Sequence, residues 1–578
     1  MFIHRSVPLL TVTFFTAILL GGCHGNQQTD ASLENRVEVE DLIAGKSLPA
    51  PIHKHQLQKY AAKSSADSMI RQRTVASSAM PARVLFPSEP QDRENYAHLD
   101  RNGVKLVSSE PVSTFSIDVD TGSYANVRRM LNEGRLPPQD AVRIEEMINY
   151  FSYDYKSPTS LKQPFRVSTE IAPAPWHSEK HLLHIGIKGY EVDRSQLPDS
   201  NLVFLVDVSG SMFAPNKLAL LKSALKMLSR QLSAKDRISL VVYAGASGVV
   251  LEPTSGNQFA RISSALDALQ AGGSTNGGAG IRLAYAMAEQ AFIKNGINRV
   301  ILTTDGDFNV GTTSFESFID LVEQKRKSGI SLTTLGFGTG NYKDHLMEQL
   351  ADKGNGNYAY IDTINEARKV LVDEVGSTLL TIAKDVKIQI EFNPDLISEY
   401  RLIGYENRML KREDFNNDRV DAGEIGAGHT VTALYEITLK GKKGLIDPLR
   451  YGKESSSKNV SADELAFLRL RYKQPDAEQN RLIEYLLRKS LIKKSHANTT
   501  KDFRFSAAVA SFGELLRGGR YSEKMDYDAV LKLARDGKGD DVHGYRGEFL
   551  NLVRTTSVLD SQQVVPDLLE GADSIISR

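Results

Sequence analysis

The feature that most limits the possible folds is a regular alternation of apolar strands and amphipathic helices between residues 201 and 376. The strand segments are LVFLVDV, RISLVVYA, RVILTTD, SLTTLGFG and NYAYI. The helix after the first of them places five leucines on one face: Leu218, Leu221, Leu225, Leu228 and Leu232. Continuous apolar strands separated by helices are typical of parallel strands that are buried on both faces. The sequence therefore predicts an α/β domain with a doubly wound, mostly parallel sheet.

Segments on either side of this pattern alternate apolar and polar residues with a period of two. FRVSTEI begins at Phe165 and HLLHIGIKG at His181, whereas DVKIQIEF begins at Asp385 and HTVTALYEI at His429. This alternation indicates strands with one solvated face. We therefore predict that the flanking strands pair into one β-domain, into which the α/β domain is inserted.

Helices are predicted for the remaining globular segments. A strand in TFSIDV leads into two amphipathic helices that form a small cap. After Asp463, the segments NRLIEYLLRKSLI, DFRFSAAVASFGELLRGG and YDAVLKLARDG have the spacing of helices. The predicted organisation is a signal peptide (1–22), a flexible polar tether (23–95), an N-terminal cap (96–164), flanking strands (165–198), the α/β domain (199–378), the β-domain (379–462) and a helical C-terminal region (463–578).

The N-terminus indicates the compartment. An apolar segment, LLTVTFFTAILL, precedes LGGC, and Cys23 is the only cysteine among the 578 residues. This segment resembles a bacterial lipoprotein signal, which implies that Cys23 is lipidated and that acyl chains anchor the protein to a membrane. Because His24 rather than an aspartate follows the cysteine, the resemblance implies an outer-membrane lipoprotein, which we expect on the periplasmic face. The alternative is an uncleaved anchor with an incidental cysteine.

Charge and loop composition argue against nucleic acid and nucleotide as ligands. Acidic and basic residues balance at 71 each, so the chain has no net charge to attract a polyanion. The glycine-rich segment GGSTNGG lacks the Gly-Lys-Ser/Thr ending of a P-loop. We therefore expect a partner that is recognised locally, and neither nucleic acid nor nucleotide.

Polar side chains occur in three segments that we expect at one edge of the predicted sheet. Asp207, Ser209 and Ser211 follow the first strand in DVSGSM, Thr275 lies in AGGSTNGG, and Asp305 ends RVILTTD. The carboxyl ends of strands in a doubly wound sheet meet at one edge, where ligands bind. Hydroxyl and carboxylate oxygens with few charges suit Mg²⁺ or Mn²⁺. The sequence therefore predicts a metal site at this edge.

This order of residues resembles the metal-ion-dependent adhesion site of von Willebrand factor type A (VWA) domains. The resemblance implies that Ser209, Ser211 and Thr275 bind the metal directly or through water. It also implies that Asp207 and Asp305 act largely through water. Because neutral hydroxyls leave most of the cation's charge uncompensated, an open position attracts a carboxylate from another protein. The predicted function is therefore binding of an Asp or Glu of a partner protein, without catalysis; the alternative is a purely structural metal in a cell-envelope scaffold protein.

A second acidic turn, DVDTGSY, offers an enzymatic alternative. Its DTGS, beginning at Asp120, spells the motif of aspartic proteases, and a hydrolase would be centred on Asp120. No second Asp-Thr-Gly exists in the chain to share a proton with it. We favour a structural role, in which Thr121 or Ser123 caps a helix that starts at Tyr124 and Asp118 and Asp120 stabilise its amino end.

The segments around the VWA-like pattern carry a second resemblance. SIDVDTGSYANVRRML to VRIEEMINYF is similar to the N-terminal region of YfbK-like bacterial lipoproteins. The region after Asp385 is similar to their C-terminal domain of unknown function. Together the resemblances cover nearly all of the mature chain.

Overall fold

The fold is taken from a computed structural model. It describes residues 94–576 except 95, 99, 118–119, 275–276, 307–314, 340–342, 448–461, 476, 478 and 523–524, and it gives only the backbone for residue 194 and for 563–576. The predicted signal peptide, Cys23 and the predicted tether up to residue 93 lie outside the described residues. None of the described helices is both long enough and apolar enough to cross a membrane.

Six strands form the sheet of the α/β domain, in the order β10-β9-β8-β5-β6-β7. Their bounds are β5 Ser200–Asp207, β6 Arg237–Tyr243, β7 Ser247–Ser255, β8 Ile297–Thr304, β9 Ser331–Phe337 and β10 Tyr358–Ile361. All neighbours pair in parallel except β6 and β7. The predicted mostly parallel sheet is confirmed, and β7 is an antiparallel edge strand that the sequence pattern did not indicate. In register, Val206 of β5 lies opposite Val242 and Thr303, so these three strands end together.

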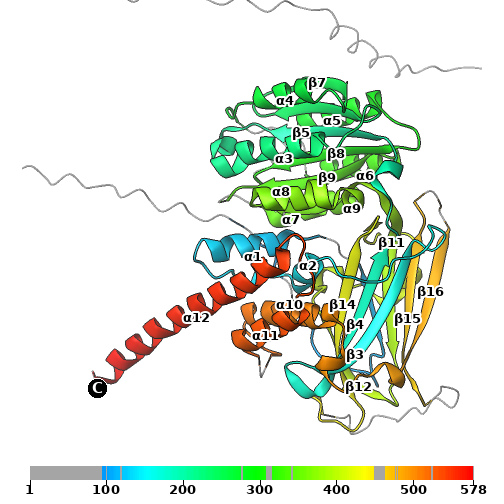
Figure 1. Cartoon of the computed structure of the whole chain (residues 1–578), viewed down its shortest axis with the longest axis vertical. Helices are drawn as coiled ribbons and strands as arrows, with labels where there is room; N and C mark the ends of the chain where they lie inside the picture. Colours follow the sequence, from blue (N-terminus) through cyan, green and yellow to red (C-terminus); the bar gives the residue numbers. More distant parts are fainter. Residues whose placement is uncertain are drawn as a thin grey trace, which may run out of the picture. The chain divides into compact units, whose positions relative to one another are not determined.

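Helices cover both faces of this sheet (Figure 1). Leu202, Phe204 and Val206 of β5 pack against one set of helices: α3 Leu220–Ser229, α4 Phe259–Asp267 and α8 Ile364–Arg368. Val203 and Leu205 point the other way, toward α5 Gly277–Gln290, α6 Phe315–Lys327 and α7 Asp344–Lys353. Because successive side chains of a strand point to opposite faces, the apolar run in β5 supplies both layers of the core.

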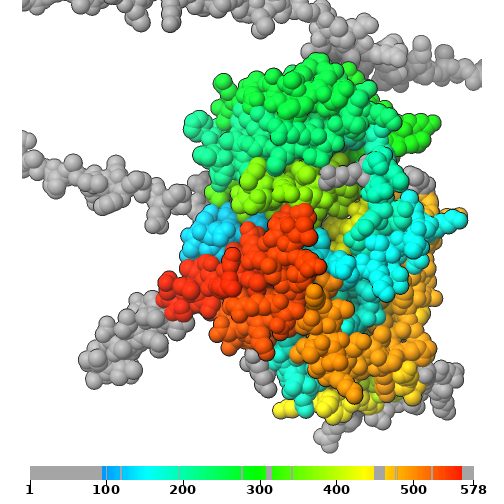
Figure 2. Space-filling view, viewed as in Figure 1, coloured from blue at the N-terminus to red at the C-terminus, as the bar shows by residue number. Residues whose placement is uncertain are grey.

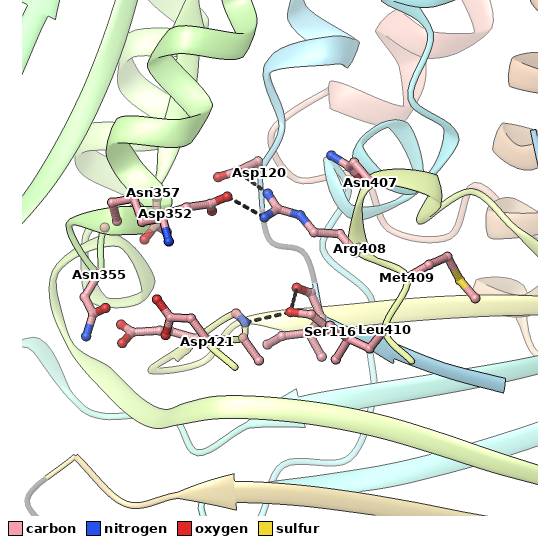
Figure 3. Close-up of a pocket in the computed structure, with 16 residues that line it drawn as sticks. Ser116, Asp120, Asp352, Asn355, Asn357, Asn407, Arg408, Met409, Leu410 and Asp421 are labelled. Atoms are coloured by element: carbon pink, nitrogen blue, oxygen red, sulfur yellow. Dashed lines mark hydrogen bonds and ion pairs between the residues drawn. The ribbon is translucent and has the colours of Figure 1, made fainter. Parts of the chain in front are cut away.

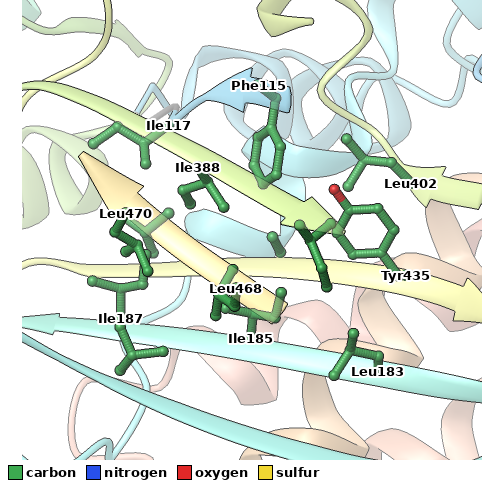
Figure 4. Close-up of a cluster of buried hydrophobic side chains, with 14 of the residues drawn as sticks. Phe115, Ile117, Leu183, Ile185, Ile187, Ile388, Leu402, Tyr435, Leu468 and Leu470 are labelled. Atoms are coloured by element: carbon green, nitrogen blue, oxygen red, sulfur yellow. The ribbon is translucent and has the colours of Figure 1, made fainter. Parts of the chain in front are cut away.

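Two antiparallel sheets form the β-domain. One has the order β1-β12-β14-β4-β3 and the other contains β13-β11-β15-β16, with β2 paired to β11. Their bounds are β1 Lys105–Leu106, β2 Val112–Ser116, β3 Phe165–Ala174, β4 His177–Gly189, β11 Thr381–Phe392, β12 Ile397–Ile403, β13 Ile425–Gly426, β14 Thr430–Leu439, β15 Glu464–Lys473 and β16 Asn480–Arg488. Ile185 and Ile187 of β4 share a core with Leu468 and Leu470 of β15 (Figure 4).

The α/β domain is inserted between strands that pair with each other. β4 precedes it in the chain, β14 follows it, and the two pair in antiparallel fashion, with Val431 opposite Ile187. The helix α9 Val375–Leu379 leads out of the α/β domain directly into β11. The predicted insertion into one β-domain is therefore confirmed.

The predicted start of the helical C-terminal region at residue 463 is wrong. Residues 464–488 form the hairpin of β15 and β16, with Leu468 opposite Tyr485. In β16, Ile483, Tyr485 and Leu487 turn inward, whereas Leu482 is 51% exposed. The neighbouring apolar pairs in NRLIEYLL imitate helical spacing, but pairing with β15 selects the alternate residues.

The N-terminal cap and the C-terminal helices form one shared core. The cap contains α1 Gly122–Asn132 and α2 Ile144–Asn149, and the C-terminal region contains α10 Lys501–Leu516, α11 Tyr527–Gly537 and α12 Tyr545–Ile576. Phe151 lies edge-on to Phe505, with ring centroids 4.9 Å apart. Helix α12, drawn red in Figure 2, lies against α1, drawn blue. Segments more than 350 residues apart in the sequence thus stabilise each other.

Candidate metal centre

Asp207 ends β5 as a buried carboxylate with fixed orientation. The Ser209 backbone N–H donates to its Oδ1 at 2.8 Å, and the Thr304 hydroxyl donates to its Oδ2 at 3.1 Å. Because Thr304 ends the neighbouring strand β8, these bonds join two strand ends. Burial raises the pKa of the Asp207 carboxyl, although the hydrogen bonds from Ser209 and Thr304 oppose this rise.

Two hydroxyl groups lie beside this carboxylate. The Oγ atoms of Ser209 and Ser211 are 3.0 Å apart. In an octahedral Mg²⁺ shell with ligand bonds of about 2.1 Å, adjacent oxygens are about 3 Å apart. Ser209 is buried and Ser211 is half-buried. The pair therefore has a spacing that fits two neighbouring ligands of one small cation.

The glycine-rich loop contacts this turn through the backbone. The Gly210 N–H donates to the Gly273 carbonyl at 3.0 Å, and the Gly272 N–H donates to the Val208 carbonyl at 2.8 Å. Gly273 has a φ of +87°, which favours glycine. The loop up to Ser274 is thus held against the DVSGS turn. Thr275 lies outside the described residues, and its role in metal binding stays a prediction.

Asp305 follows β8 and is fully buried. The Lys217 ammonium group donates to its Oδ2 at 2.8 Å, and the Lys217 side chain is 9% exposed. Asp305 also adds to the rise in the Asp207 pKa. The sequence pattern did not single out Lys217, because it lies in an irregular segment, FAPNK, where no periodicity indicates which way a side chain points.

The donor atoms at this edge fit Mg²⁺ or Mn²⁺. Within the described part of the chain, no three His, Cys, Asp or Glu side chains gather in a way that would hold a metal ion. The candidate centre instead comprises two serine hydroxyls and two carboxylates, which lie at or just after the ends of the paired strands β5 and β8. Hard oxygen donors of this kind suit Mg²⁺ or Mn²⁺ rather than Zn²⁺, which prefers histidine and cysteine. The assignment of these residues as ligands stays a prediction.

An exposed aromatic side chain lies next to these residues in the chain. Phe213 follows Ser211 by two positions and is 83% exposed. It belongs to a short helical turn, Gly210–Phe213, in which Met212 is instead fully buried. Phe213 therefore contributes exposed apolar surface two residues after Ser211. No periodicity in the sequence indicates Phe213, although its place two residues after Ser211 was a signal that could have identified it.

Asp120 lies at a different site, in a pocket of about 210 Å³ between strand ends and loops (Figure 3). Asp120 is 3% exposed. Oδ1 accepts a hydrogen bond from the Tyr358 backbone N–H at 2.9 Å, and Oδ2 accepts one from the Arg408 guanidinium at 3.0 Å. These bonds join the start of the cap to β10 and to the β-domain, which is a structural reason for the acid.

The predicted capping of the first cap helix is wrong in detail. Helix α1 begins at Gly122 rather than Tyr124, and its N-cap residue, Thr121, makes no side-chain capping hydrogen bond. The Ser123 hydroxyl instead donates to the Ala141 carbonyl at 2.6 Å. The Ser123 side chain therefore connects α1 to the segment that precedes α2 and does not cap the helix. Asp118 lies outside the described residues.

Glu424 lines the pocket that contains Asp120. Its carboxyl group is expected to make the stability of the protein depend on pH. Burial raises the pKa of its carboxyl to about 7, although Lys384 and a hydrogen bond from Thr381 oppose the rise. Because the folded-state pKa exceeds the unfolded value of about 4.3, the stabilising contribution is full at low pH and is lost as the pH rises toward about 7. We expect this group to lower the free energy of unfolding by up to about 1.4 kcal/mol per pH unit in that window.

Urea titrations between pH 4.5 and 8 measure this effect. Glu424→Gln should flatten the decline, because the amide has no proton to lose. Glu391→Gln, on an exposed residue of β11, is the matched control and should leave the decline unchanged. Equal slopes in wild type and Glu424→Gln would contradict the prediction.

Comparisons with known proteins agree with this architecture. Family models match in three places: the von Willebrand factor type A domain over residues 201–373, a model described as von Willebrand factor over 90–184, and the C-terminal domain of the uncharacterized protein YfbK over 377–559. The chain is 46% identical over 505 residues to the uncharacterized protein YfbK of Escherichia coli strain K12, which covers 86% of this chain and 87% of that protein. The chain belongs to the YfbK family.

This YfbK-family chain also has more distant similarities. Human inter-alpha-trypsin inhibitor heavy chain H3 is 26% identical over 263 residues, which are 42% of this chain and 28% of that protein. Among solved structures, a von Willebrand factor type A protein from Catenulispora acidiphila matches with a TM-score of 0.37 and 15% identity, covering 68% of this chain and 89% of that one. The predicted VWA domain and YfbK-type C-terminal domain are confirmed. A VWA domain indicates a function in protein–protein interaction.

Proposed function

We propose that this YfbK-family protein is an outer-membrane lipoprotein that binds a partner protein through a divalent cation. Lipidated Cys23 anchors it, and the partner supplies an Asp or Glu carboxylate. Mg²⁺ or Mn²⁺ is held by five residues: Asp207, Ser209, Ser211, Thr275 and Asp305. The observation that carries the proposal is the pair of serine hydroxyls, 3.0 Å apart, beside a buried carboxylate at the carboxyl edge of the VWA sheet.

The chemistry of the donors favours binding over catalysis. Ser209 and Ser211 contribute no formal charge, so a bound dication keeps an affinity for an external carboxylate. The hydrogen bonds from Ser209 and Thr304 fix the orientation of Asp207 before any cation binds. Prearranged donors reduce the ordering that ligand binding requires. A hydrolase centred on Asp120 has no comparable support, because that carboxylate is paired with Arg408.

Phe213 adds an apolar contact at the rim of the centre. Aromatic residues are enriched among the side chains that dominate binding energy in protein interfaces. With 83% of its surface exposed, Phe213 is available to such a partner. The proposed binding surface therefore combines one cation with one aromatic anchor.

Photo-cross-linking in cells tests this proposal. Phe213 is replaced by the photoreactive aromatic residue p-benzoylphenylalanine in the full-length protein, and adducts are identified after irradiation. We expect one dominant protein adduct that disappears when EDTA is added or when Ser209→Ala is introduced. Both changes remove the cation while leaving the photoreactive side chain in place.

The same photoreactive residue at position 292 is the matched control. Phe292 is also an exposed aromatic, at 45%, but it lies between α5 and the start of β8, at the opposite edge of the sheet. Adducts from that position should not depend on EDTA. If the adducts at position 213 also persist unchanged in EDTA and in Ser209→Ala, while EDTA lowers the melting temperature, the metal is structural and the proposed function is wrong.

A further inference from the structure

Lys217 places a positive charge inside the candidate metal centre. Its ammonium group lies 2.8 Å from Oδ2 of Asp305, and the two side chains are 9% and 0% exposed. Ion pairs at the surface are common and weak, but this pair is removed from water on both sides. Asp305 is one of the two carboxylates proposed to attract the divalent cation.

The backbone and a glycine fix the position of this lysine. At Lys217, inside the turn Pro215–Ala219 that precedes α3, the chain leaves helical geometry, with φ −117° and ψ −105°. Its aliphatic stem crosses Gly338, which follows β9: a Cβ at Gly338 would lie 2.3 Å from Cε of Lys217. The stem thus runs through a space that only glycine leaves open, and the ammonium group is directed at Asp305.

An ammonium group and a divalent cation at this centre compete for the same carboxylate. With Lys217 in place, Asp305 is neutralised locally, and only the charge of Asp207 remains to attract a cation. A second positive charge within a few ångströms also repels the dication. Both effects lower the affinity of the centre for metal.

We propose that Lys217 is a built-in competitor that weakens divalent-cation binding and makes it depend on the partner. Lys217 neutralises the charge of Asp305, and the partner's carboxylate supplies a negative charge in its place. The cation and the partner therefore bind cooperatively: each raises the affinity of the protein for the other by the same factor. This inference rests on the proposed function, since it presupposes a cation at this centre. In this mechanism Lys217 is a positioning residue that acts through Asp305 and does not itself contact the cation.

Manganese binding to the full-length protein in detergent tests the inference. Mn²⁺ is titrated in the absence of any partner, and the dissociation constant is measured by calorimetry. We expect Lys217→Met to bind Mn²⁺ at least tenfold more tightly than wild type, because methionine keeps the length of the stem and removes the charge. Lys217→Arg, which keeps the charge, should stay within about threefold of wild type.

Lys226→Met is the matched control. Lys226 lies on α3 and pairs with the exposed Asp267 at 2.5 Å, so this variant loses the same net charge away from the centre. Its affinity for Mn²⁺ should remain within twofold of wild type. A general effect of net charge would strengthen binding in both methionine variants equally and would overturn the inference.

A second readout covers the case in which Lys217→Met is unstable. Lys217→Gln is then titrated in the same way, and the melting temperatures of all variants are compared with and without Mn²⁺. Mn²⁺ should raise the melting temperature more in Lys217→Met and Lys217→Gln than in wild type. In these variants Asp305 has lost the Lys217 ammonium group, and a bound Mn²⁺ compensates its charge.

The outcomes separate this inference from the proposed function. Tighter binding in Lys217→Met and Lys217→Gln supports the inference, also when wild type binds too weakly to measure. Equal affinity of wild type and both variants overturns the role of Lys217 but leaves the metal-dependent function intact. If no variant binds Mn²⁺, the inference and the proposed function are both wrong.

Discussion

Replacing Arg128 with methionine is expected to lower the free energy of unfolding by about 3–5 kcal/mol. Arg128 of α1 is fully buried, and its guanidinium donates to Asp362 at 2.8 Å and to Glu366 at 2.7 Å. It also donates to Glu548 of α12 at 3.0 Å. Methionine would leave the carboxylates of Asp362 and Glu366 buried without their cation, which is the costly way to break a buried ion pair.

Urea unfolding followed by the fluorescence of Trp176 measures this change. Trp176 is the only tryptophan and lies in the core shared by the cap and the C-terminal helices. Arg135→Met removes the same charge from an exposed pair with Glu133 and should change stability by less than about 1 kcal/mol.

A combined variant separates charge from packing. Adding Asp362→Asn and Glu366→Gln to Arg128→Met removes all three charges together and should recover much of the lost stability. A loss below about 1 kcal/mol in Arg128→Met would contradict the prediction. No recovery in the combined variant would mean that packing, rather than the unpaired charge, causes the loss.

Replacing Ser209 and Ser211 together with alanine is expected to weaken Mn²⁺ binding at least a hundredfold. Each substitution removes one oxygen atom, so the double variant loses two proposed ligands that are 3.0 Å apart. The Ser209 backbone N–H that orients Asp207 stays in place. The double variant should therefore lose metal affinity while keeping its fold. Calorimetric titration with Mn²⁺ measures the affinity.

Ser223→Ala is the matched control for this variant. Ser223 lies on the exposed side of α3, where its hydroxyl donates to the Ala219 carbonyl at 3.1 Å. Its removal should leave Mn²⁺ binding unchanged, and the melting temperatures without metal should agree within a few degrees among all three proteins. Unchanged affinity in Ser209→Ala/Ser211→Ala would mean that the cation, if bound, is held elsewhere.

Most of the fold was predictable because its signals are local. The apolar run in β5 ends at Asp207, and the alternation in β4 and β14 correctly indicates strands. The predicted solvated face is wrong for these two strands, because residues of both faces of β14 and of the middle of β4 are buried. These patterns report which residues of a segment must be buried, and burial determines the element type. The wrong prediction of a helix at residues 480–488 has the same basis, because the apolar pairs there fit the spacing of a helix as well as that of a strand. Pairing with β15 makes this segment a strand.

The chemistry of the candidate centre was predictable from residue types and their order, because these specify oxygen donors at one edge of a sheet. The cations that pair with these acids were not predictable, because they come from distant segments of the chain. Lys217 faces Asp305 across 88 residues, and Arg408 pairs with Asp120 across 288. An ion pair between distant segments depends on how whole elements pack, and no local periodicity encodes the direction of a side chain in an irregular loop. The sequence therefore predicted a metal centre, whereas the structure revealed the lysine that we propose to compete for it.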